Sequence, residues 1–332
     1  MTSVVAVDLG KTGCRAVLWD TTESSRSVRA VPGAPGLAAP GGVAAAREAV
    51  RAAVGPLLQQ AGGGRLGTVL VGAAGAASAP AAARSLVTAL LEDLPTHEAA
   101  VTSDAVTAHA GALGGRAGVV LAIGTGAVAV GIGTDGSYAR VDGWGPQLGD
   151  DGSGAWIGTA GLRAALRAHD GRGPATMLLS AAVDRFGDPD RLPLTLGRDG
   201  NPARTAASFA PEVARSADAG DAVASSIVQD AAAALGETVL AAVRRIAGDA
   251  TLPVTITGGL AGIGSALMTP LTEKITGSGL PLRLDDPLGD PLDGARLLAL
   301  NAAAPHESLV VRVRRTTSTT PPPTPETPPA SV

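Results

Sequence analysis

Short apolar runs alternate with longer Ala-rich runs along most of the chain. The short runs, which are rich in Val, Leu and Ile, predict strands at residues 4–7, 15–19, 68–71, 99–102, 119–123, 127–132 and 254–257. The Ala-rich runs predict helices at residues 43–60, 80–91, 105–113, 160–168, 221–247, 260–276 and 295–303. The stretch 21–42, rich in Pro, Gly and Ser, predicts a loop. Strands that alternate with helices indicate an α/β layer architecture.

Two strand–turn–strand units recur more than a hundred residues apart. The first turns through Asp8-Leu9-Gly10-Lys11-Thr12-Gly13, and the second turns through Gly124-Thr125-Gly126. Their similarity indicates a duplicated domain rather than a tandem repeat. We therefore expect one lobe at residues 1–110 and a second at residues 111–312. Residues 313–332 are rich in Pro and Thr and predict a disordered tail.

Composition and charge exclude several classes of protein. Aromatic residues make up 2% of the 332 residues and the net charge is -4, which disfavours a nucleic-acid partner. No uninterrupted apolar stretch reaches the ~18 to 20 residues that span a membrane, and no targeting segment is recognisable at the N-terminus. The single cysteine, Cys14, excludes an intramolecular disulfide and any cysteine-ligated zinc or iron–sulfur site within one chain. These features predict a cytoplasmic protein without a nucleic-acid or membrane partner.

Three glycine-containing turns are candidates for phosphate binding. They are the turn at residues 8–13, the turn at residues 124–126 and the turn Thr257-Gly258-Gly259. Glycine lets backbone N–H groups approach a phosphate closely, and Thr or Lys adds a donor or a charge. None of the three fits the Walker pattern or the dinucleotide fingerprint. Each turn taken alone is therefore typical of an ordinary loop.

Acidic residues stand at the ends of two predicted strands and inside a glycine-rich block. Asp8 and Asp104 each end a strand, where a ligand crevice opens in α/β sheets. Asp104 is also in position to be a helix N-cap, and both roles can coexist. Asp150 and Asp151 lie within the block 143–154, which contains five glycines, and Trp144 and Trp156 stand on either side of this acidic pair. A turn of this kind indicates that Asp150 and Asp151 are functional residues rather than parts of a solvent-exposed loop.

In order along the chain, these motifs resemble the BadF/BadG/BcrA/BcrD ATPase family. The most specific part is Gly143-Trp144-Gly145 followed by Leu148-Gly149-Asp150-Asp151-Gly152-Ser153 and Trp156-Ile157-Gly158, with Asp151 where the family has Glu. Within the family the likeness is greatest to N-acetylglucosamine kinases, and it extends over residues 4–305. The resemblance implies an actin-like fold of two ribonuclease H-like lobes with ATP in the cleft between them.

The same resemblance implies a role for each motif in phosphoryl transfer from ATP to the 6-hydroxyl of an amino sugar. Asp8 is expected to hold Mg²⁺, and Asp104 to act as the base toward the sugar hydroxyl. ATP is expected to contact Gly10, Lys11, Thr12, Gly124, Thr125, Gly126, Gly258 and Gly259. The sugar is expected to contact Asp104, Thr125, Gly145 and Asp150. Relatives of this kind are often dimers, which makes a homodimer an expectation here.

One departure from the family leaves the substrate open. The loop Val31–Leu37 contains no Asn, whereas relatives that bind the N-acetyl group commonly carry one there. Glucosamine and N-acetylmuramic acid are therefore alternatives to N-acetylglucosamine, and a non-catalytic ATP-binding sugar sensor is another. The family branch that energises acyl-CoA reductases uses cysteine-ligated clusters, which the lone Cys14 does not suit. Arg163 and Arg167, four residues apart on a predicted helix, are typical of a solvated helix face.

Overall fold

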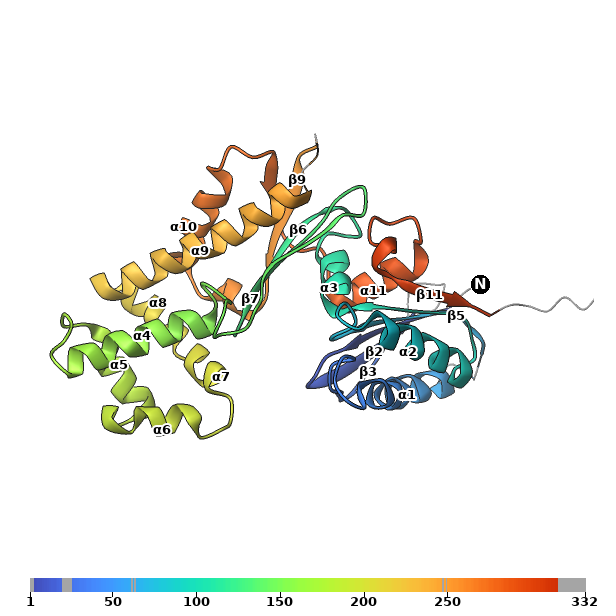
Figure 1. Cartoon of the computed structure of the whole chain (residues 1–332), viewed down its shortest axis with the longest axis horizontal. Helices are drawn as coiled ribbons and strands as arrows, with labels where there is room; N and C mark the ends of the chain where they lie inside the picture. Colours follow the sequence, from blue (N-terminus) through green and yellow to red (C-terminus); the bar gives the residue numbers. More distant parts are fainter. Residues whose placement is uncertain are drawn as a thin grey trace, which may run out of the picture.

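Two β-sheets, one in each lobe, form the framework of two lobes that lie side by side (Figure 1). The computed structural model describes residues 3–19, 26–60, 62, 64–246, 248 and 250–315. The first sheet has the order β11-β5-β4-β1-β2-β3, formed by β1 (Val4–Leu9), β2 (Gly13–Trp19), β3 (Arg26–Pro32), β4 (Leu66–Ala73), β5 (Thr96–Ser103) and β11 (Val311–Arg314). The second has the order β10-β9-β6-β7-β8, formed by β6 (Gly118–Ile123), β7 (Ala127–Ile132), β8 (Tyr138–Asp142), β9 (Leu252–Thr257) and β10 (Leu282–Leu284).

The two sheets share one pairing scheme. In the first, β1 pairs antiparallel with β2 and parallel with β4. In the second, β6 pairs antiparallel with β7 and parallel with β9. The third strand of each meander, β3 or β8, adds antiparallel at the hairpin edge. The duplication and the two-lobed α/β fold predicted from the sequence are confirmed.

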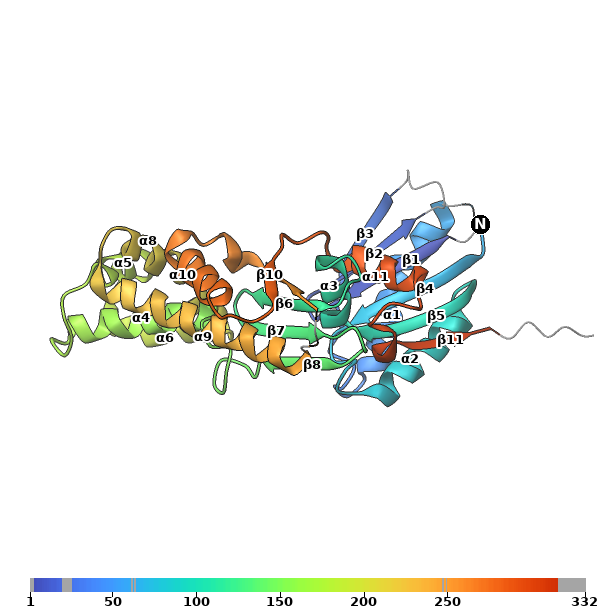
Figure 2. The ribbon, with the colours of Figure 1, turned by 90° about the horizontal axis from the view of Figure 1, so that it is seen from above.

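Both faces of the first sheet are covered by helices (Figure 2). Successive side chains of β1 point to opposite faces of the sheet, so Val5 and Val7 belong to one core cluster while Ala6 belongs to another. Helices α1 (Gly42–Gln60) and α2 (Pro80–Asp93) cover the face of Val5 and Val7. Helices α3 (Asp104–Ala112) and α11 (Pro291–Leu300) cover the face of Ala6. Strand β1 is therefore buried on both sides, which suits its nearly continuous apolar sequence.

The C-terminal segment returns to the first lobe, although the sequence placed residues 111–312 in the second. Strand β11 pairs antiparallel with the outer edge of β5, and α11 packs against α3. The carboxylate of Glu98, buried in β5, accepts hydrogen bonds from Arg312 at 2.5 Å and from Arg314. These pairings close an open sheet edge and neutralise a buried charge. The predicted boundary near residue 110 stays a prediction.

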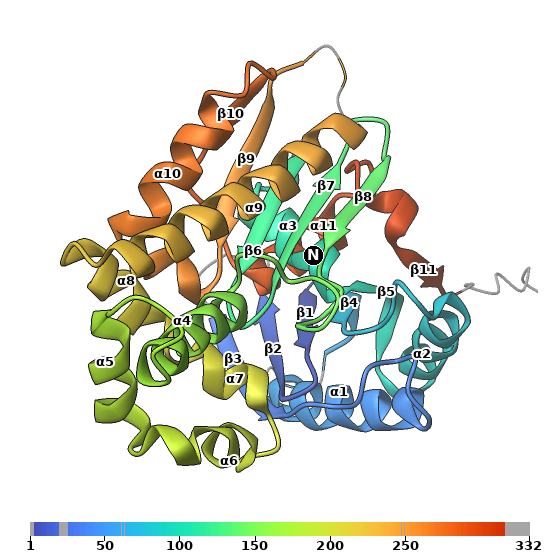
Figure 3. The ribbon, with the colours of Figure 1, turned by 60° about the vertical axis from the view of Figure 1, so that its left-hand side comes forward.

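The second lobe carries most of the helices (Figure 3). They are α4 (Gly154–His169), α5 (Met177–Phe186), α6 (Leu192–Gly197), α7 (Pro202–Ala207), α8 (Ala210–Asp218), α9 (Ala222–Ile246) and α10 (Ser265–Thr276). Helix α9 lies across β6, β7 and β8 and also packs on α10. By length and composition α9 could cross a membrane, but 56% of its most apolar stretch is buried inside the fold, as in a core helix.

The sequence did not indicate every element. Strand β3 lies inside the predicted loop 21–42, and its pairing with β2 from Gly13↔Pro32 to Trp19↔Arg26 defines it as a strand. Strands β8 and β10 and helices α5–α8 were also not predicted. Short elements of this kind depend on neighbours in the fold more than on intrinsic propensity. The disordered tail predicted at residues 313–332 begins too early, because Val313 and Arg314 belong to β11, which pairs with β5; residues 316–332 lie outside the described residues.

A buried histidine pair joins α3 to the C-terminal return. His109 Nδ1 lies 2.9 Å from His306 Nε2, and His109 Nε2 lies 2.9 Å from the carbonyl oxygen of Gly118 at the start of β6. If His109 donates to Gly118, its Nδ1 accepts the N–H of His306. Burial lowers the pKa of His109 to about 3 and that of His306 to about 4. The pair therefore stays neutral and links α3, β6 and the segment after α11.

Candidate active site

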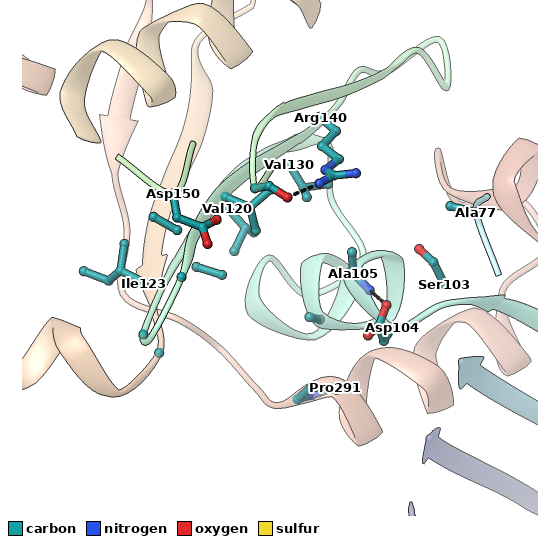
Figure 4. Close-up of a pocket in the computed structure, with 18 of the residues that line it drawn as sticks. Ala77, Ser103, Asp104, Ala105, Val120, Ile123, Val130, Arg140, Asp150 and Pro291 are labelled. Carbon is teal, nitrogen blue, oxygen red and sulfur yellow. Dashed lines mark hydrogen bonds between the residues drawn. The ribbon is translucent and has the colours of Figure 1, made fainter. Parts of the chain in front are cut away.

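A cleft of about 720 Å³ is lined by residues from both lobes (Figure 4). The first lobe contributes Asp8, Ser103 and Asp104, and the second contributes Gly124, Gly126, Asp150 and Gly258. Figure 4 shows Asp104 at the start of α3 and Asp150 across the cleft from it. The cleft therefore joins acids and glycine turns that are far apart in the sequence.

Asp104 occupies the first turn of α3 but does not cap the helix. The N-cap is Ser103, whose hydroxyl accepts a hydrogen bond from the Val106 N–H at 3.2 Å. Asp104 accepts from the adjacent Ala105 N–H, at 2.9 Å, and from its own N–H. Burial raises the pKa of the Asp104 carboxyl, and the negative charge of Asp8 raises it further, whereas the charge of Lys11 opposes the rise. Since Ser103 performs the capping, the Asp104 carboxylate remains available to a ligand.

Asp8 lies at the end of β1 and is held by an arginine on the neighbouring strand. Asp8 and Arg15 are cross-strand partners, and Arg15 donates to Asp8 Oδ2 at 2.7 Å. Arg15 also lies 3.5 Å from Asp290, the residue that caps α11. The Asp8 side chain remains about 21% exposed. The carboxylate is therefore oriented by the protein and still accessible from the cleft.

The first glycine turn is closed by its own backbone. Gly10 N–H donates to the carbonyl of Gly13 at 2.9 Å, and Ala34 N–H donates to the carbonyl of Gly10 at 3.2 Å. The second contact seats the loop after β3 on this turn. This is the loop without an Asn, so any contact that it makes with a sugar comes from groups other than a side-chain amide.

The second glycine turn is docked on the glycine-rich block. The carbonyls of Gly124 and Thr125 accept hydrogen bonds from the first N–H groups of α4, at 2.8 and 3.1 Å. A Cβ at Gly126 would lie 2.9 Å from Asp150 Oδ2, so only glycine lets the turn approach this carboxylate so closely. The N–H groups of Ala127 and Gly145 donate to Asp150 and oppose the rise in its pKa that burial causes. The turn and Asp150 therefore form one unit.

Asp142, which the sequence analysis did not single out, organises the block around Asp150. Its two carboxylate oxygens accept the N–H groups of Asp150 and Asp151, each at 2.8 Å. Both Asp142 and Asp150 have positive φ values, 62° and 59°. Non-glycine residues adopt this conformation at a cost, which is offset here by the bracketing hydrogen bonds. An acid directly before Gly143-Trp144-Gly145 was the only sequence signal for this role.

The third glycine turn follows β9 and lies against the end of β6. Gly258 has φ 98°, and a Cβ there would be 2.2 Å from the carbonyl oxygen of Ile123. The neighbouring β6 and β9 thus bring the turns at 124–126 and 257–259 together at one end of the second sheet. This is the expected position for a ligand in an α/β fold.

Comparison with known proteins settles the family. The model of the BadF/BadG/BcrA/BcrD ATPase family matches residues 5–299. The chain belongs to the BadF/BadG/BcrA/BcrD ATPase family. It is 31% identical to N-acetyl-D-glucosamine kinase of Dictyostelium discoideum over 66% of this chain and 70% of that protein. It is 34% identical to N-acetylmuramic acid/N-acetylglucosamine kinase of Clostridium acetobutylicum over 43% of this chain and 47% of that protein.

A solved structure supports the same relationship. A candidate N-acetylglucosamine kinase from Chromobacterium violaceum superposes with a TM-score of 0.66 and 28% sequence identity. The match covers 91% of this chain and 99% of that one. The family membership predicted from the sequence motifs is confirmed.

The predicted site residues of this family member divide into two groups. Six line the cleft, namely Asp8, Asp104, Gly124, Gly126, Asp150 and Gly258. The other six, Gly10, Lys11, Thr12, Thr125, Gly145 and Gly259, lie in the turns and the block beside it and do not line it. Tyr138 and Arg140 line the cleft but were not predicted, because they belong to the unpredicted strand β8.

The donor set at Asp8 fits magnesium bound together with a nucleotide. Among the described residues no group of three or more His, Cys, Asp or Glu side chains could hold a metal ion. A single accessible carboxylate suits Mg²⁺, which keeps several waters and takes its remaining ligands from phosphates. Asp8 is therefore suited to an ion that arrives with a nucleotide.

Proposed function

We propose that the protein is an ATP-dependent amino-sugar kinase that phosphorylates the 6-hydroxyl of N-acetylglucosamine and releases ADP. The observation that carries this proposal is the cleft in which Asp104, from the first lobe, faces Asp150 and two glycine turns of the second. A base opposite a phosphate-binding turn is the arrangement that phosphoryl transfer to a hydroxyl requires. The family and the named relatives support the same activity.

The chain's own residues supply the positioning and the proton transfer. Asp104 accepts the proton of the attacking hydroxyl, and Asp150 binds neighbouring sugar hydroxyls. The turns at residues 10–12 and 124–126 offer the phosphates the Lys11 charge and those N–H groups that do not close the turns, since Gly10 N–H donates to Gly13 and Gly124 N–H donates to Gly126. Gly258 and Gly259 bind the adenosine, and Thr125 and Gly145 contact the sugar. The raised pKa of Asp104 makes it a stronger base than an exposed aspartate.

Magnesium belongs to the same proposal. Asp8 would hold Mg²⁺, which neutralises charge on the phosphate oxygens during transfer. Asp8 itself is oriented by Arg15, so its carboxylate points in a defined direction before the nucleotide arrives.

The proposal also includes the cellular location of the protein and its oligomeric state. A cytoplasmic location is supported by the use of ATP and by the single buried thiol of Cys14. A homodimer stays a prediction from the family resemblance. Glucosamine and N-acetylmuramic acid remain candidate substrates because the loop after β3 lacks an Asn.

ADP release over a panel of sugars tests the proposed activity. With ATP and Mg²⁺, we expect N-acetylglucosamine to raise ADP release well above the sugar-free rate, because the sugar hydroxyl is the acceptor of the phosphoryl group. The panel includes glucosamine, N-acetylmuramic acid and glucose. If ATP binds but no sugar stimulates ADP release, the kinase assignment fails and a sugar sensor becomes the better description.

A further inference from the structure

A second cavity, of about 520 Å³, adjoins the cleft and shares Asp150 with it. It lies between the glycine-rich block, the first half of α4 and the segment from α6 to α7. Its polar and aromatic lining consists of Gln147, Asp150, Ser153, Trp156, Thr159, Arg163 and Asn201. Apart from Asp150, no residue of this lining has a role in the function proposed above.

One face of α4 forms a wall of the cavity. Trp156, Thr159 and Arg163 are spaced by three and four residues, so they stand on the same side of the helix. Helical side chains lean toward the N-terminus, so Arg163 extends along this face toward Trp156 and the Asp150 end. The opposite wall is formed by Leu196 and residues 200–203.

Arg163 brings a positive charge without a partner. Within the described residues it forms no ion pair and no hydrogen bond. Its neighbour on the helix, Arg167, donates to the carbonyl of Arg172 and does not line the cavity. Asp150, at the other end, is already held by the N–H groups of Ala127 and Gly145. The cavity therefore offers a free guanidinium at a distance from its only carboxylate.

The amide side chains in the cavity offer further donors. The Oδ1 atom of Asn201 accepts the Arg204 N–H at 3.1 Å, because Asn201 caps α7, which leaves its NH₂ group for a ligand. Gln147 is exposed at the mouth. A guanidinium and an amide N–H beside an indole ring suit a sugar substituent that ends in a carboxylate.

We propose that this cavity binds an acidic substituent of the amino sugar and that Arg163 recognises its carboxylate. The inference rests on the proposed kinase function and extends it to the substrate class. Asp104 receives the reacting hydroxyl in the cleft, and Asp150 is common to the cleft and the cavity. A sugar ring bound by Asp150 therefore turns the edge opposite its reacting hydroxyl toward the cavity. An ether-linked carboxylate on that edge contacts Arg163.

The test compares N-acetylmuramic acid, which carries a lactyl carboxylate, with N-acetylglucosamine. Arg163→Gln is expected to lower the ratio of kcat/KM for the acidic over the neutral sugar by about 10- to 100-fold, the range for a charge-assisted hydrogen bond. Arg163→Lys, which keeps the charge, is expected to retain more of that ratio. The matched control is Arg167→Gln, one turn along the same helix, which is expected to leave the ratio at the wild-type value.

An uncharged probe separates charge from shape. 3-O-Methyl-N-acetylglucosamine fills part of the same space without a carboxylate, and its kcat/KM is expected to be insensitive to Arg163→Gln. The proposal is overturned if the wild type phosphorylates N-acetylglucosamine but not N-acetylmuramic acid. It is also overturned if Arg163→Gln lowers kcat/KM for both sugars equally while the melting temperature is unchanged. Failure of every sugar to be phosphorylated would instead refute the kinase function itself.

Discussion

Asp104→Asn is expected to lower kcat for sugar phosphorylation by about 10²- to 10⁴-fold, the usual contribution of a general base. An amide cannot accept the hydroxyl proton, whereas its size preserves the packing at the start of α3. Binding of ATP, measured by calorimetry, is expected to change little because Asp104 is assigned to the sugar hydroxyl and not to a contact with the nucleotide. Rapid-quench measurement of sugar phosphate gives kcat directly.

The pH dependence of kcat provides a second readout of the same residue. Burial and Asp8 raise the pKa of the Asp104 carboxyl above its ordinary value of 3.8, so the wild-type rate is expected to fall on the acid side at a correspondingly higher pH. The Asn variant is expected to lose this acid limb. Ser103→Ala is the control, because it removes the cap of α3 at a cost of about 1 kcal/mol but keeps the base. Retention of more than a tenth of wild-type kcat by Asp104→Asn would contradict the assignment.

Gly294→Ala is expected to destabilise the protein by about 3 kcal/mol or more, through overpacking of two helices. A Cβ at Gly294 in α11 would lie 1.9 Å from the carbonyl oxygen of Thr107 in α3. A Cβ at Gly111 would likewise lie 2.0 Å from the carbonyl of Asp290. Both obstacles are backbone atoms, so the helices must move apart. Chemical denaturation measures the loss.

The control for this substitution is another glycine inside a helix. At Gly236 in α9 a Cβ would meet only the flexible side chain of Lys274, at 2.8 Å or more. Gly236→Ala is therefore expected to stay within about 1 kcal/mol of the wild type, since Ala also favours the helix. Equal stability of Gly294→Ala and the wild type would show that α3 and α11 are less closely packed than described.

The elements that the sequence predicted are those with strong local signals. Both hairpins were predicted because glycine turns separate short apolar strands, as at Gly10 and Gly126. The glycine-rich block was singled out because Asp150 stands among glycines and tryptophans. Its family motif then placed Asp8, Asp104 and Gly258 in the same cleft, as the structure does.

The features that the sequence missed depend on distant partners. Strand β11 becomes a strand by pairing with β5, more than 200 residues earlier, and by matching Arg312 to the buried Glu98. From the sequence, Asp104 is a candidate N-cap of the helix that follows it. In the structure the cap is its neighbour Ser103, which lies one position earlier. The two backbone hydrogen bonds that Asp142 accepts depend on the positive φ values of Asp142 and Asp150, which no residue-type pattern indicated.

The position of the transferred phosphate tests the central claim most directly. After reaction of ATP, Mg²⁺ and N-acetylglucosamine with the enzyme, proton-coupled ³¹P NMR of the purified product reports the protons next to the ester oxygen. Phosphorylation of the 6-hydroxyl predicts a phosphorus resonance coupled to the two protons of a CH₂ group. A resonance coupled to one proton, or inorganic phosphate alone, would contradict the proposed reaction.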